Sequence, residues 1–480
     1  MEPKHASRRI EPGSFRDPDS RVLITPEGVF RVLSDEGLAD WRALSASPLF
    51  ERFVREGSLI ETSEASDARA LLRELDGPEG ALATAPAAVL RHERIPFISY
   101  PYEWTFGMLR DAALLELDLL IASLDEGLIL KDATPYNVQW RGARPVFIDV
   151  GSFERLREGE PWAGYRQFCM QFLYPLLIQA YRDIPFQPWL RGRLEGISPV
   201  EAARLLPGRH RLRRGVISHV ALHARLERRY EGREGGEVRS ELRRARFGTE
   251  MIRANARRLR KLVARLEWKP GASAWAEYRR TGTYTDEDSE RKAEFVRRAA
   301  AEVRPALIWD LGCNDGAYSR VAAEGGGYVV AIDSDHATIE ALYRSLREEG
   351  ERSILPLVAD LADPSPGLGW RGSERRPLTE RGAPDLILCL ALVHHLSITA
   401  NVPLREVVEW LAALEAPLVV EFPSRDDPMV RRLLSAKRES AHADYERDSF
   451  ERLLAERFRI ERREDLGSGT RALYLALPRE

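Results

Sequence analysis

An α/β fold with a doubly wound parallel sheet is predicted for the C-terminal half of this 480-residue chain by the order of its apolar runs. The run 307–311 leads into a glycine turn, a helix is expected to begin near Ala317, and a second run, 328–332, ends in Asp333. A strand, a glycine turn, a helix and a strand-end acid form the βαβ unit with which an open sheet holds a nucleoside-bearing cofactor. Further apolar runs, alternating with helical spacers, predict the other strands of a sheet that is covered on both faces. These runs are 354–361, 385–392, 417–422, 457–460 and 471–477.

The spacing of the glycines indicates the kind of cofactor. A dinucleotide site favours Gly-x-Gly-x-x-Gly over a pyrophosphate, whereas the turn here is Asp310-x-Gly312-x-Asn314-x-Gly316. An acid in the turn, with no basic residue nearby, suits a cationic ligand better than a pyrophosphate. The turn resembles the first motif of class I S-adenosylmethionine-dependent methyltransferases. This resemblance implies that Asp310 and the glycines hold the methionine part of the cofactor and that Asp333 binds its ribose.

The resemblance covers about residues 270 to 480 and implies further cofactor contacts. Asp360, in the third predicted strand, is expected to accept a hydrogen bond from the adenine amino group, with Leu361 beside it. Ala391, at the end of the fourth strand, completes the expected cofactor-binding set. The alternative is an α/β domain that has a tight turn and binds no ligand.

Candidate catalytic residues follow the fourth and fifth predicted strands. His394 and His395 stand where the family places acceptor-facing residues, and a histidine near its ordinary pKa of about 6.5 suits a general base. Glu421, in the fifth strand, is a rival base or an orienting acid. The alternative is that one histidine packs or caps a helix while only the other faces the acceptor. Tyr278 and Tyr284 could close over the cofactor or pack in the core.

Motifs that the sequence lacks bear on the acceptor. No Asp/Asn-Pro-Pro-aromatic motif, which methyltransferases use on nucleobase amino groups, follows the fourth predicted strand. No Pro-Cys pair offers a nucleophile for carbon methylation of pyrimidines. These gaps favour an oxygen acceptor, or a nitrogen of a small molecule, over a nucleobase. No metal site is expected, because a carboxylate cluster for metal-assisted catechol chemistry cannot be assembled from the sequence.

A second constellation lies in residues 21–200, where Asp132-x-x-x-x-Asn137 is followed by an apolar run that ends in Asp149-x-Gly. It resembles the catalytic and metal loops of protein kinases and small-molecule phosphotransferases. The resemblance implies that Asp132 is the catalytic base and that Asn137 and Asp149 hold Mg²⁺ with ATP. Leu130 stands where these proteins carry a histidine, and no glycine-rich loop precedes it. We therefore expect an α+β kinase-like lobe with weak or absent ATP turnover. The alternative is that the three polar residues only brace turns by capping backbone groups.

Length and composition predict the domain organisation and the compartment. The chain has room for several domains, which we expect as a loose tail to residue 20, the kinase-like domain 21–200, a helical Arg-rich connector 201–268 and the methyltransferase domain 269–480. The net charge of −3 creates no global field that would recruit nucleic acid. Three widely separated cysteines and an N-terminus without an apolar run predict a cytoplasmic protein. The longest apolar stretch, Phe168–Tyr181, is too short to span a membrane.

The arginines of the connector offer a competing function. They could line a phosphate-binding face that serves an RNA methyltransferase or binds a phosphorylated glycan. Acids are interleaved with them, however, so a solvated, salt-bridged helical face is the favoured prediction. The arginines are Arg211, Arg213, Arg214, Arg225, Arg228, Arg229, Arg243, Arg244 and Arg246, and the acids are Glu227, Glu231, Glu234 and Glu241.

Both halves together resemble a bacterial family of predicted methyltransferases that carry this N-terminal domain, some of them nodulation-type proteins. The residues that carry the resemblance are Ser99–Trp104 and Leu130–Ala133. The predicted function is S-adenosylmethionine-dependent methyl transfer to an oxygen of a small molecule or glycan. Two other hypotheses stay open. One is a bifunctional enzyme that phosphorylates and methylates a glycan or metabolite, and the other is a non-catalytic protein that only binds the cofactor.

Overall fold

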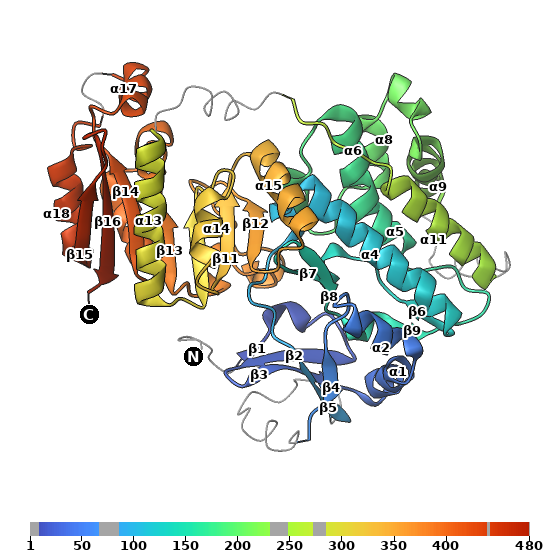
Figure 1. The fold of residues 1–480 in the computed structure, drawn as a ribbon. Helices are drawn as coiled ribbons and strands as arrows, with labels where there is room; N and C mark the ends of the chain where they lie inside the picture. The colour runs from blue at the N-terminus through green and yellow to red at the C-terminus, as the bar shows by residue number, and fades with distance from the viewer. Residues whose placement is uncertain (1–8, 67–85, 231–247, 272–284, 439–441, 480) are drawn as a thin grey trace.

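The computed structural model describes residues 9–66, 86–230, 248–271, 285–438 and 442–479 (Figure 1). The C-terminal part is built on a seven-stranded sheet with the strand order β12-β11-β10-β13-β14-β16-β15. The first five strands in the chain pair in parallel, and the last two pair antiparallel. The strands are β10 (Leu307–Leu311), β11 (Tyr328–Asp333), β12 (Ile354–Val358), β13 (Leu386–Cys389), β14 (Leu418–Pro423), β15 (Phe458–Asp465) and β16 (Arg471–Pro478). The predicted α/β class is confirmed, and each predicted strand of this sheet is present.

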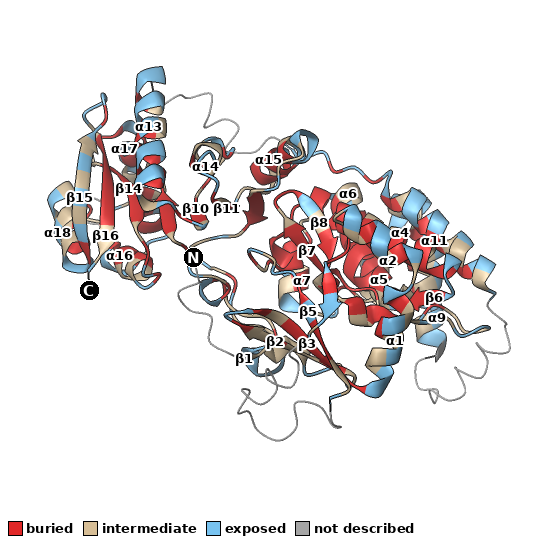
Figure 2. Cartoon of the chain, turned by 60° about the horizontal axis from the view of Figure 1, so that its bottom comes forward, coloured by how far each residue is buried: buried red, intermediate tan, exposed pale blue. Residues whose placement is uncertain are grey.

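Helices cover both faces of this sheet, which is why its parallel strands are buried along most of their length. Figure 2 shows α13 and α14 on one side of the sheet and α16 and α18 on the other. The chain passes outward from β10 through β11 to β12 and then crosses back to β13, so the strand order reverses between β10 and β13. Ligands of open α/β sheets bind at the carboxyl ends of the strands at such a reversal. The helices are α13 (Asp286–Val303), α14 (Ala317–Ala323), α15 (His336–Glu349), α16 (Leu404–Ala412), α17 (Pro428–Ser435) and α18 (Arg447–Arg457).

The N-terminal part combines an antiparallel sheet with a layer of helices. The sheet has the order β1-β2-β3-β5-β4, and two further hairpin-like pairs, β6 with β9 and β7 with β8, lie between it and the helices. Its strands are β1 (Arg9–Ile10), β2 (Ser20–Thr25), β3 (Gly28–Leu33), β4 (Thr62–Glu64), β5 (Ala88–His92), β6 (Leu128–Leu130), β7 (Val138–Arg141), β8 (Arg144–Phe147) and β9 (Phe153–Arg155). Its α-helices are α1 (Asp35–Ser45), α2 (Pro48–Arg55), α4 (Phe106–Asp125), α5 (Tyr165–Phe168), α6 (Tyr174–Arg182), α7 (Gln187–Gly192), α8 (Pro199–Leu205), α9 (Leu222–Tyr230) and α11 (Thr249–Val263).

Helix α4 forms the centre of this layer. Thr105 caps its first turn by accepting a hydrogen bond from the Met108 backbone N–H, and apolar residues on nearly all sides of the helix account for its burial. Short 3-10 turns and π-helical turns complete the architecture. The 3-10 turns are Pro12–Ser14, Pro101–Glu103, Pro135–Asn137, Val150–Ser152, Gly208–Leu212, Trp370–Gly372 and Leu378–Glu380, and the π-helical turns are Cys169–Leu173, Val216–Ala221 and His395–Thr399.

Two segments differ from the organisation expected from the sequence. Residues 9–20 are held in place, because β1 pairs with β2 and because Glu11 and Arg16 form ion pairs with Arg376 and Glu374. In the expected connector, α9 packs on α8 and α11 packs on α4. The described residues of 201–268 therefore belong to the helical layer of the N-terminal part, since their apolar faces are buried there.

The N-terminal and C-terminal parts meet across a buried contact. Arg381 and Glu103 form a two-pronged ion pair of 2.5 and 2.6 Å, and both side chains are buried. The Gly107 N–H donates to Glu340 Oε2 at 2.8 Å. One hydrophobic core cluster contains residues from both parts. None of the described helices is long and apolar enough to cross a membrane.

Candidate active site

The glycine turn after β10 is fixed by its backbone. Gly312 and Gly316 both have φ of +76°, in the left-handed region that favours glycine. The Gly312 N–H donates to the Ile332 carbonyl of β11 at 2.8 Å, which holds the turn against the neighbouring strand. A Cβ at Gly316 would lie 2.7 Å from Leu342 Cδ1 of α15. The turn therefore requires glycine here for both conformation and space.

Asp333, at the end of β11, lies beside this turn. Its Oδ2 accepts a hydrogen bond from the Asn314 N–H at 3.0 Å, and its Oδ1 accepts one from the Asp335 N–H at 2.9 Å. Burial raises the pKa of Asp333 above its ordinary value, although these backbone donors oppose the shift. A carboxylate has about four acceptor positions, so Asp333 keeps capacity for hydroxyl donors of a ligand.

Asp310 lies underneath the turn. The Ser319 hydroxyl of α14 donates to Asp310 Oδ2 at 2.5 Å, and the side chain is buried. Burial raises the pKa of Asp310 to about 6. Asp310 thus ties the start of α14 to β10, and a contact between its carboxylate and a cofactor stays a prediction.

The remaining expected cofactor residues lie at the same edge of the sheet. Asp360 follows β12, is exposed, and accepts the Ala362 N–H at 2.9 Å. Leu361 and Ala391 are half-buried, and Ala391 has φ of +51° just after β13. Because β12, β11, β10 and β13 are adjacent and parallel, their carboxyl ends place these residues along one edge with Gly312.

The two candidate histidines have different surroundings. His394 is fully buried, and neither of its ring nitrogens has a hydrogen-bond partner in the described part of the chain. Burial, then His395, Arg471 and Lys292, hold the pKa of His394 well below its ordinary value. The His395 ring lies 4.1 Å from that of His394, centroid to centroid, and is half-buried. Burial and then Arg471 lower the pKa of His395 to about 4, so both imidazoles are neutral near pH 7.

Glu421 is buried between two cations. Its Oε2 lies 2.7 Å from Lys292 Nζ, and its Oε1 lies 3.1 Å from Arg471 Nη1. Arg471 in turn pairs with Asp427 at 2.6 Å, and Lys292 Nζ lies 4.6 Å from the ring centroid of Tyr318. This arrangement favours the orienting role for Glu421 over that of a base. No local pattern marked Lys292, Arg471 or Asp427 as site residues, because they come from three separate elements, α13, β16 and the start of α17.

The three residues of the expected phosphotransfer site converge on Ser152. Ser152 Oγ lies 2.5 Å from Asp132 Oδ1 and 3.0 Å from Asp149 Oδ2, and Asn137 Nδ2 donates to it at 2.9 Å. Burial and then the charge of Asp149 raise the pKa of Asp132 to about 6. Burial alone would raise the pKa of Asp149, but Arg31, whose Nη1 lies 2.8 Å from Asp149 Oδ1, holds it below the ordinary value. Sequence reasoning missed Ser152, which has no distinguishing local pattern.

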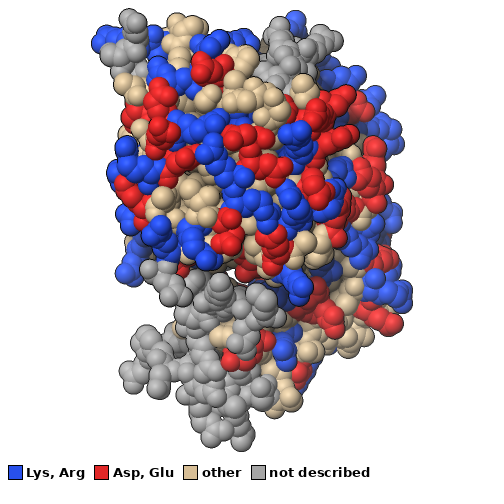
Figure 3. Space-filling model, turned by 60° about the vertical axis from the view of Figure 1, so that its left-hand side comes forward, with Lys and Arg blue, Asp and Glu red and all other residues tan. Residues whose placement is uncertain are grey.

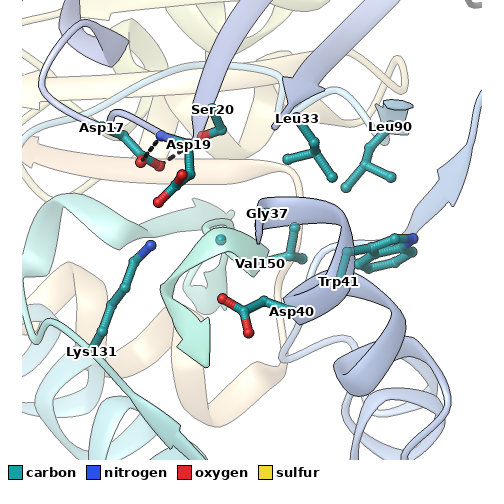
Figure 4. Close-up of a pocket in the computed structure, with 11 residues that line it drawn as sticks. Asp17, Asp19, Ser20, Leu33, Gly37, Asp40, Trp41, Leu90, Lys131 and Val150 are labelled. Carbon is teal, nitrogen blue, oxygen red and sulfur yellow. Dashed lines mark hydrogen bonds between the residues drawn. The ribbon is translucent and has the colours of Figure 1, made fainter. Parts of the chain in front are cut away.

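A small cavity lies beside this cluster (Figure 4). Lys131 points toward Asp19 there, with Asp40 on the opposite wall. The space open to a water-sized sphere is about 10 Å³, which is close to what a single water molecule needs. Within the described residues, no group of three or more His, Cys, Asp or Glu side chains is placed to hold a metal ion.

Some expected residues lie outside the described part of the chain. They are Tyr278, Tyr284, Arg243, Arg244, Arg246, Glu231, Glu234 and Glu241.

A doubly wound sheet with a glycine turn at its order reversal and an acid at the end of the adjacent strand defines the class of α/β proteins that bind a nucleoside-bearing cofactor. The sequence is 36% identical over 465 residues to nodulation protein NoeA of Rhizobium meliloti (strain 1021), and the match spans 96% of this chain and 94% of that protein. The chain therefore belongs to the NoeA family of nodulation proteins. No family model matches the sequence.

Solved structures resemble the chain only distantly. Magnesium protoporphyrin IX methyltransferase from Synechocystis PCC 6803 with bound SAH is 16% identical, with a TM-score of 0.29, and the match covers 40% of this chain and 84% of that one. The N-methyltransferase NodS from Bradyrhizobium japonicum WM9 is 14% identical, with a TM-score of 0.30, over 40% of this chain and 98% of that one.

Proposed function

We propose that the C-terminal part of the chain is a methyltransferase that binds S-adenosylmethionine and methylates an oxygen of a small molecule or glycan. The observation that carries the proposal is the glycine turn at the order reversal between β10 and β13, with Asp333 beside it. The turn fits a closely bound ligand, because it keeps side-chain atoms away from the strand ends. Asp333 fits the ribose, because its carboxylate has acceptor capacity beyond the two backbone donors that it already binds.

The residues of the site have separate roles in this proposal. S-adenosylmethionine supplies an activated methyl group when bound. Asp333 accepts the ribose hydroxyls, and Asp360 accepts the adenine amino group. His395 is partly exposed, whereas His394 is fully buried, so His395 is the residue that meets the acceptor. A neutral imidazole can accept the hydrogen bond of an acceptor hydroxyl and take its proton as the methyl group is transferred. The network of Lys292, Glu421 and Arg471 fixes α13 against β14 and β16.

The charge of the C-terminal face supports a neutral or weakly charged acceptor. Figure 3 shows basic and acidic side chains interspersed over this face, with no large field of one sign. A nucleic-acid substrate would favour a continuous basic surface. The mixed charge of this face therefore favours a small-molecule or glycan acceptor over RNA.

Calorimetry with S-adenosylmethionine and its demethylated product tests the cofactor part of the proposal. Gly312→Arg is expected to abolish binding, because a long side chain would fill the turn, while the melting temperature shows whether the variant folds. Gly326→Arg is the matched control, since Gly326 also has a positive φ but faces open space. Wild-type protein that gives no binding heat would overturn the proposal. If binding holds, loss of methyl transfer from labelled cofactor in His395→Ala, with binding retained, would support the assignment of His395.

The N-terminal part has a second candidate function, phosphotransfer. The convergence of Asp132, Asn137 and Asp149 on Ser152 favours it. Arg31 already neutralises Asp149, however, and the adjacent cavity is far smaller than a nucleotide. We therefore propose a kinase-like domain with weak or absent ATP turnover. Magnesium-dependent ATP consumption that is lost in Asp149→Ala and kept in Asp333→Ala would instead establish a bifunctional enzyme.

A further inference from the structure

Exposed apolar side chains gather in one short stretch of the helical layer. Leu212 is 83% exposed, Ile217 60%, Leu222 52% and Leu226 40%. Isolated exposed apolar side chains are ordinary, but a cluster of them marks an interaction surface. The other large apolar side chains that are exposed among the described residues are Phe15, Met251 and Trp370.

The helix geometry brings three of these side chains into one row. The π-helical turn Val216–Ala221 runs directly into α9, and the Leu222 N–H donates to the Ile217 carbonyl. A π-helical turn places residues i and i+5 above one another, and an α-helical turn does so for residues i and i+4. Ile217, Leu222 and Leu226 therefore form a row on the outer side. The inner side of the same helix is filled by Val216, Val220 and Ala224, which are buried.

The stretch that holds this row is rich in exposed arginines. Residues 202–230 contain a single acid, Glu227, and it pairs with Arg166 from α5. None of the arginines in that stretch forms an ion pair with a carboxylate in the described part of the chain. Glu231, Glu234 and Glu241, the other acids of the salt-bridged face predicted from the sequence, lie outside the described residues, so that face stays a prediction. The arginines, all exposed, are Arg204, Arg209, Arg211, Arg213, Arg214, Arg225, Arg228 and Arg229.

We propose that this surface, named here the Leu/Arg face (Leu212, Ile217, Leu222 and Leu226 with the eight arginines), docks on an anionic lipid surface. A basic amphipathic helix lies in the interfacial plane of a membrane, with its apolar row among the acyl chains and its cations at the headgroups. Both halves of that requirement are present in the continuous helix 216–230, which carries the apolar row together with Arg225, Arg228 and Arg229. A nucleic acid would engage the arginines alone and leave the leucines in water, so it accounts for less of the face. The proposal does not depend on methyl transfer.

Vesicle co-sedimentation of the full chain tests this proposal. Binding is expected with vesicles that contain phosphatidylglycerol, and much less binding with vesicles of pure phosphatidylcholine. Arg225→Gln/Arg229→Gln should lower the partition coefficient about 30-fold, because each cation near an anionic surface contributes about 1 kcal/mol. Ile217→Ser/Leu222→Ser/Leu226→Ser keeps the charge and should lower it at least about tenfold, because the apolar area inserted is lost.

Matched controls separate lipid docking from general charge. Arg452→Gln/Arg459→Gln removes two exposed arginines of α18 and β15, elements that lie at the opposite end of the molecule from α9 (Figure 1), and should leave vesicle binding unchanged. Melting curves check that each variant folds, which is expected because the altered side chains are exposed. Absence of vesicle binding by the wild type would overturn the proposal. So would a serine variant that binds vesicles as well as the wild type, or an RNA oligonucleotide that binds more tightly than the vesicles and loses affinity only in the arginine variant.

Discussion

Asp333 connects the turn after β10 to the end of β11 through its bonds with the Asn314 and Asp335 backbones. Replacing it with Ala removes the acceptor for the ribose hydroxyls. We expect the affinity for S-adenosylmethionine to fall about 10-fold or more, since a hydrogen bond to a charged group contributes about 1.5–3 kcal/mol. Titration calorimetry measures this affinity. Asp363→Ala, at an exposed acid beyond β12, is the control and should bind normally. Equal affinities of Asp333→Ala and wild type would show that the ribose is held elsewhere.

Glu116 of α4 gives a pH-dependent prediction at the same scale. It is fully buried, and neither carboxylate oxygen has a hydrogen-bond partner in the described residues. Burial, then the charges of Asp132 and Asp149, raises the pKa of Glu116 well above 4.5. The folded state therefore holds this proton more tightly than the unfolded chain does, and stability is lost as pH rises from about 4.5 towards the folded pKa.

Glu116→Gln replaces the buried carboxyl with an amide, which does not ionise in the unfolded chain either. We therefore expect it to stabilise the protein by about 1–3 kcal/mol near neutral pH. The advantage should shrink to nothing as pH falls well below about 4.5, where the wild-type carboxyl is protonated in both states. Denaturant unfolding at several pH values measures the difference. A wild type more stable than Glu116→Gln at neutral pH would contradict this account.

At the scale of elements, the network of Lys292, Glu421 and Arg471 anchors α13 to β14 and β16. All three side chains are at most 2% exposed. Glu421→Leu leaves two buried cations without this partner, so we expect it to lower the free energy of unfolding by about 3–5 kcal/mol. Glu464→Gln is the matched control, because the exposed pair of Arg298 and Glu464 also joins α13 to the sheet and should contribute at most about 1 kcal/mol. Equal losses in the two variants would refute the anchoring role.

Elements with local signals were predictable, and contacts between distant elements were not. The strands from β10 to β16 and the turn at Gly312 follow from apolar runs and glycine spacing within a few residues. Lys292 had no such signal, because it looks like any surface lysine of an amphipathic helix until Glu421 is placed opposite. Arg31 lies in the antiparallel pair of β2 and β3, and nothing local indicated that it would reach Asp149. The basic character of α9 was visible, but its apolar row depends on the π-helical turn before it.

At the scale of the whole molecule, the pair of Arg381 and Glu103 joins the two parts. We expect wild-type protein to unfold in one calorimetric transition, because the parts share one core. Arg381→Met leaves Glu103 buried without this partner and should lower the melting temperature and separate two transitions. Arg191→Gln is the control, since the exposed pair of Arg191 and Asp363 spans the same two parts and should change little. One unshifted transition in Arg381→Met would show that the pair does not couple them.

The relative placement of the two parts was the least predictable feature. The sheet of the C-terminal part could be assigned from its own sequence pattern, but the contact between the two parts depends on close approach at single positions. A Cβ at Gly107 would lie 2.8 Å from the Tyr343 ring, and one at Gly142 would lie 2.6 Å from the Arg352 backbone. Tyr343 also donates from its hydroxyl to Asp111 Oδ2 at 2.6 Å. These contacts pair residues far apart in the chain, so no local pattern could indicate them.

The close approach at Gly107 and Gly142 also limits how this protein can be taken apart or recombined. A C-terminal fragment cut before α13 would present the Tyr343 ring and the Arg381 guanidinium to water, and the N-terminal fragment would present Glu103 and Asp111. Such fragments are prone to aggregate, because each exposes to water a surface that is buried in the full chain. Chimeras that exchange one half between relatives would succeed only where the N-terminal half has glycine at both positions, because any side chain there would clash with the C-terminal half. Evolution of either half is accordingly tied to the shape of the other.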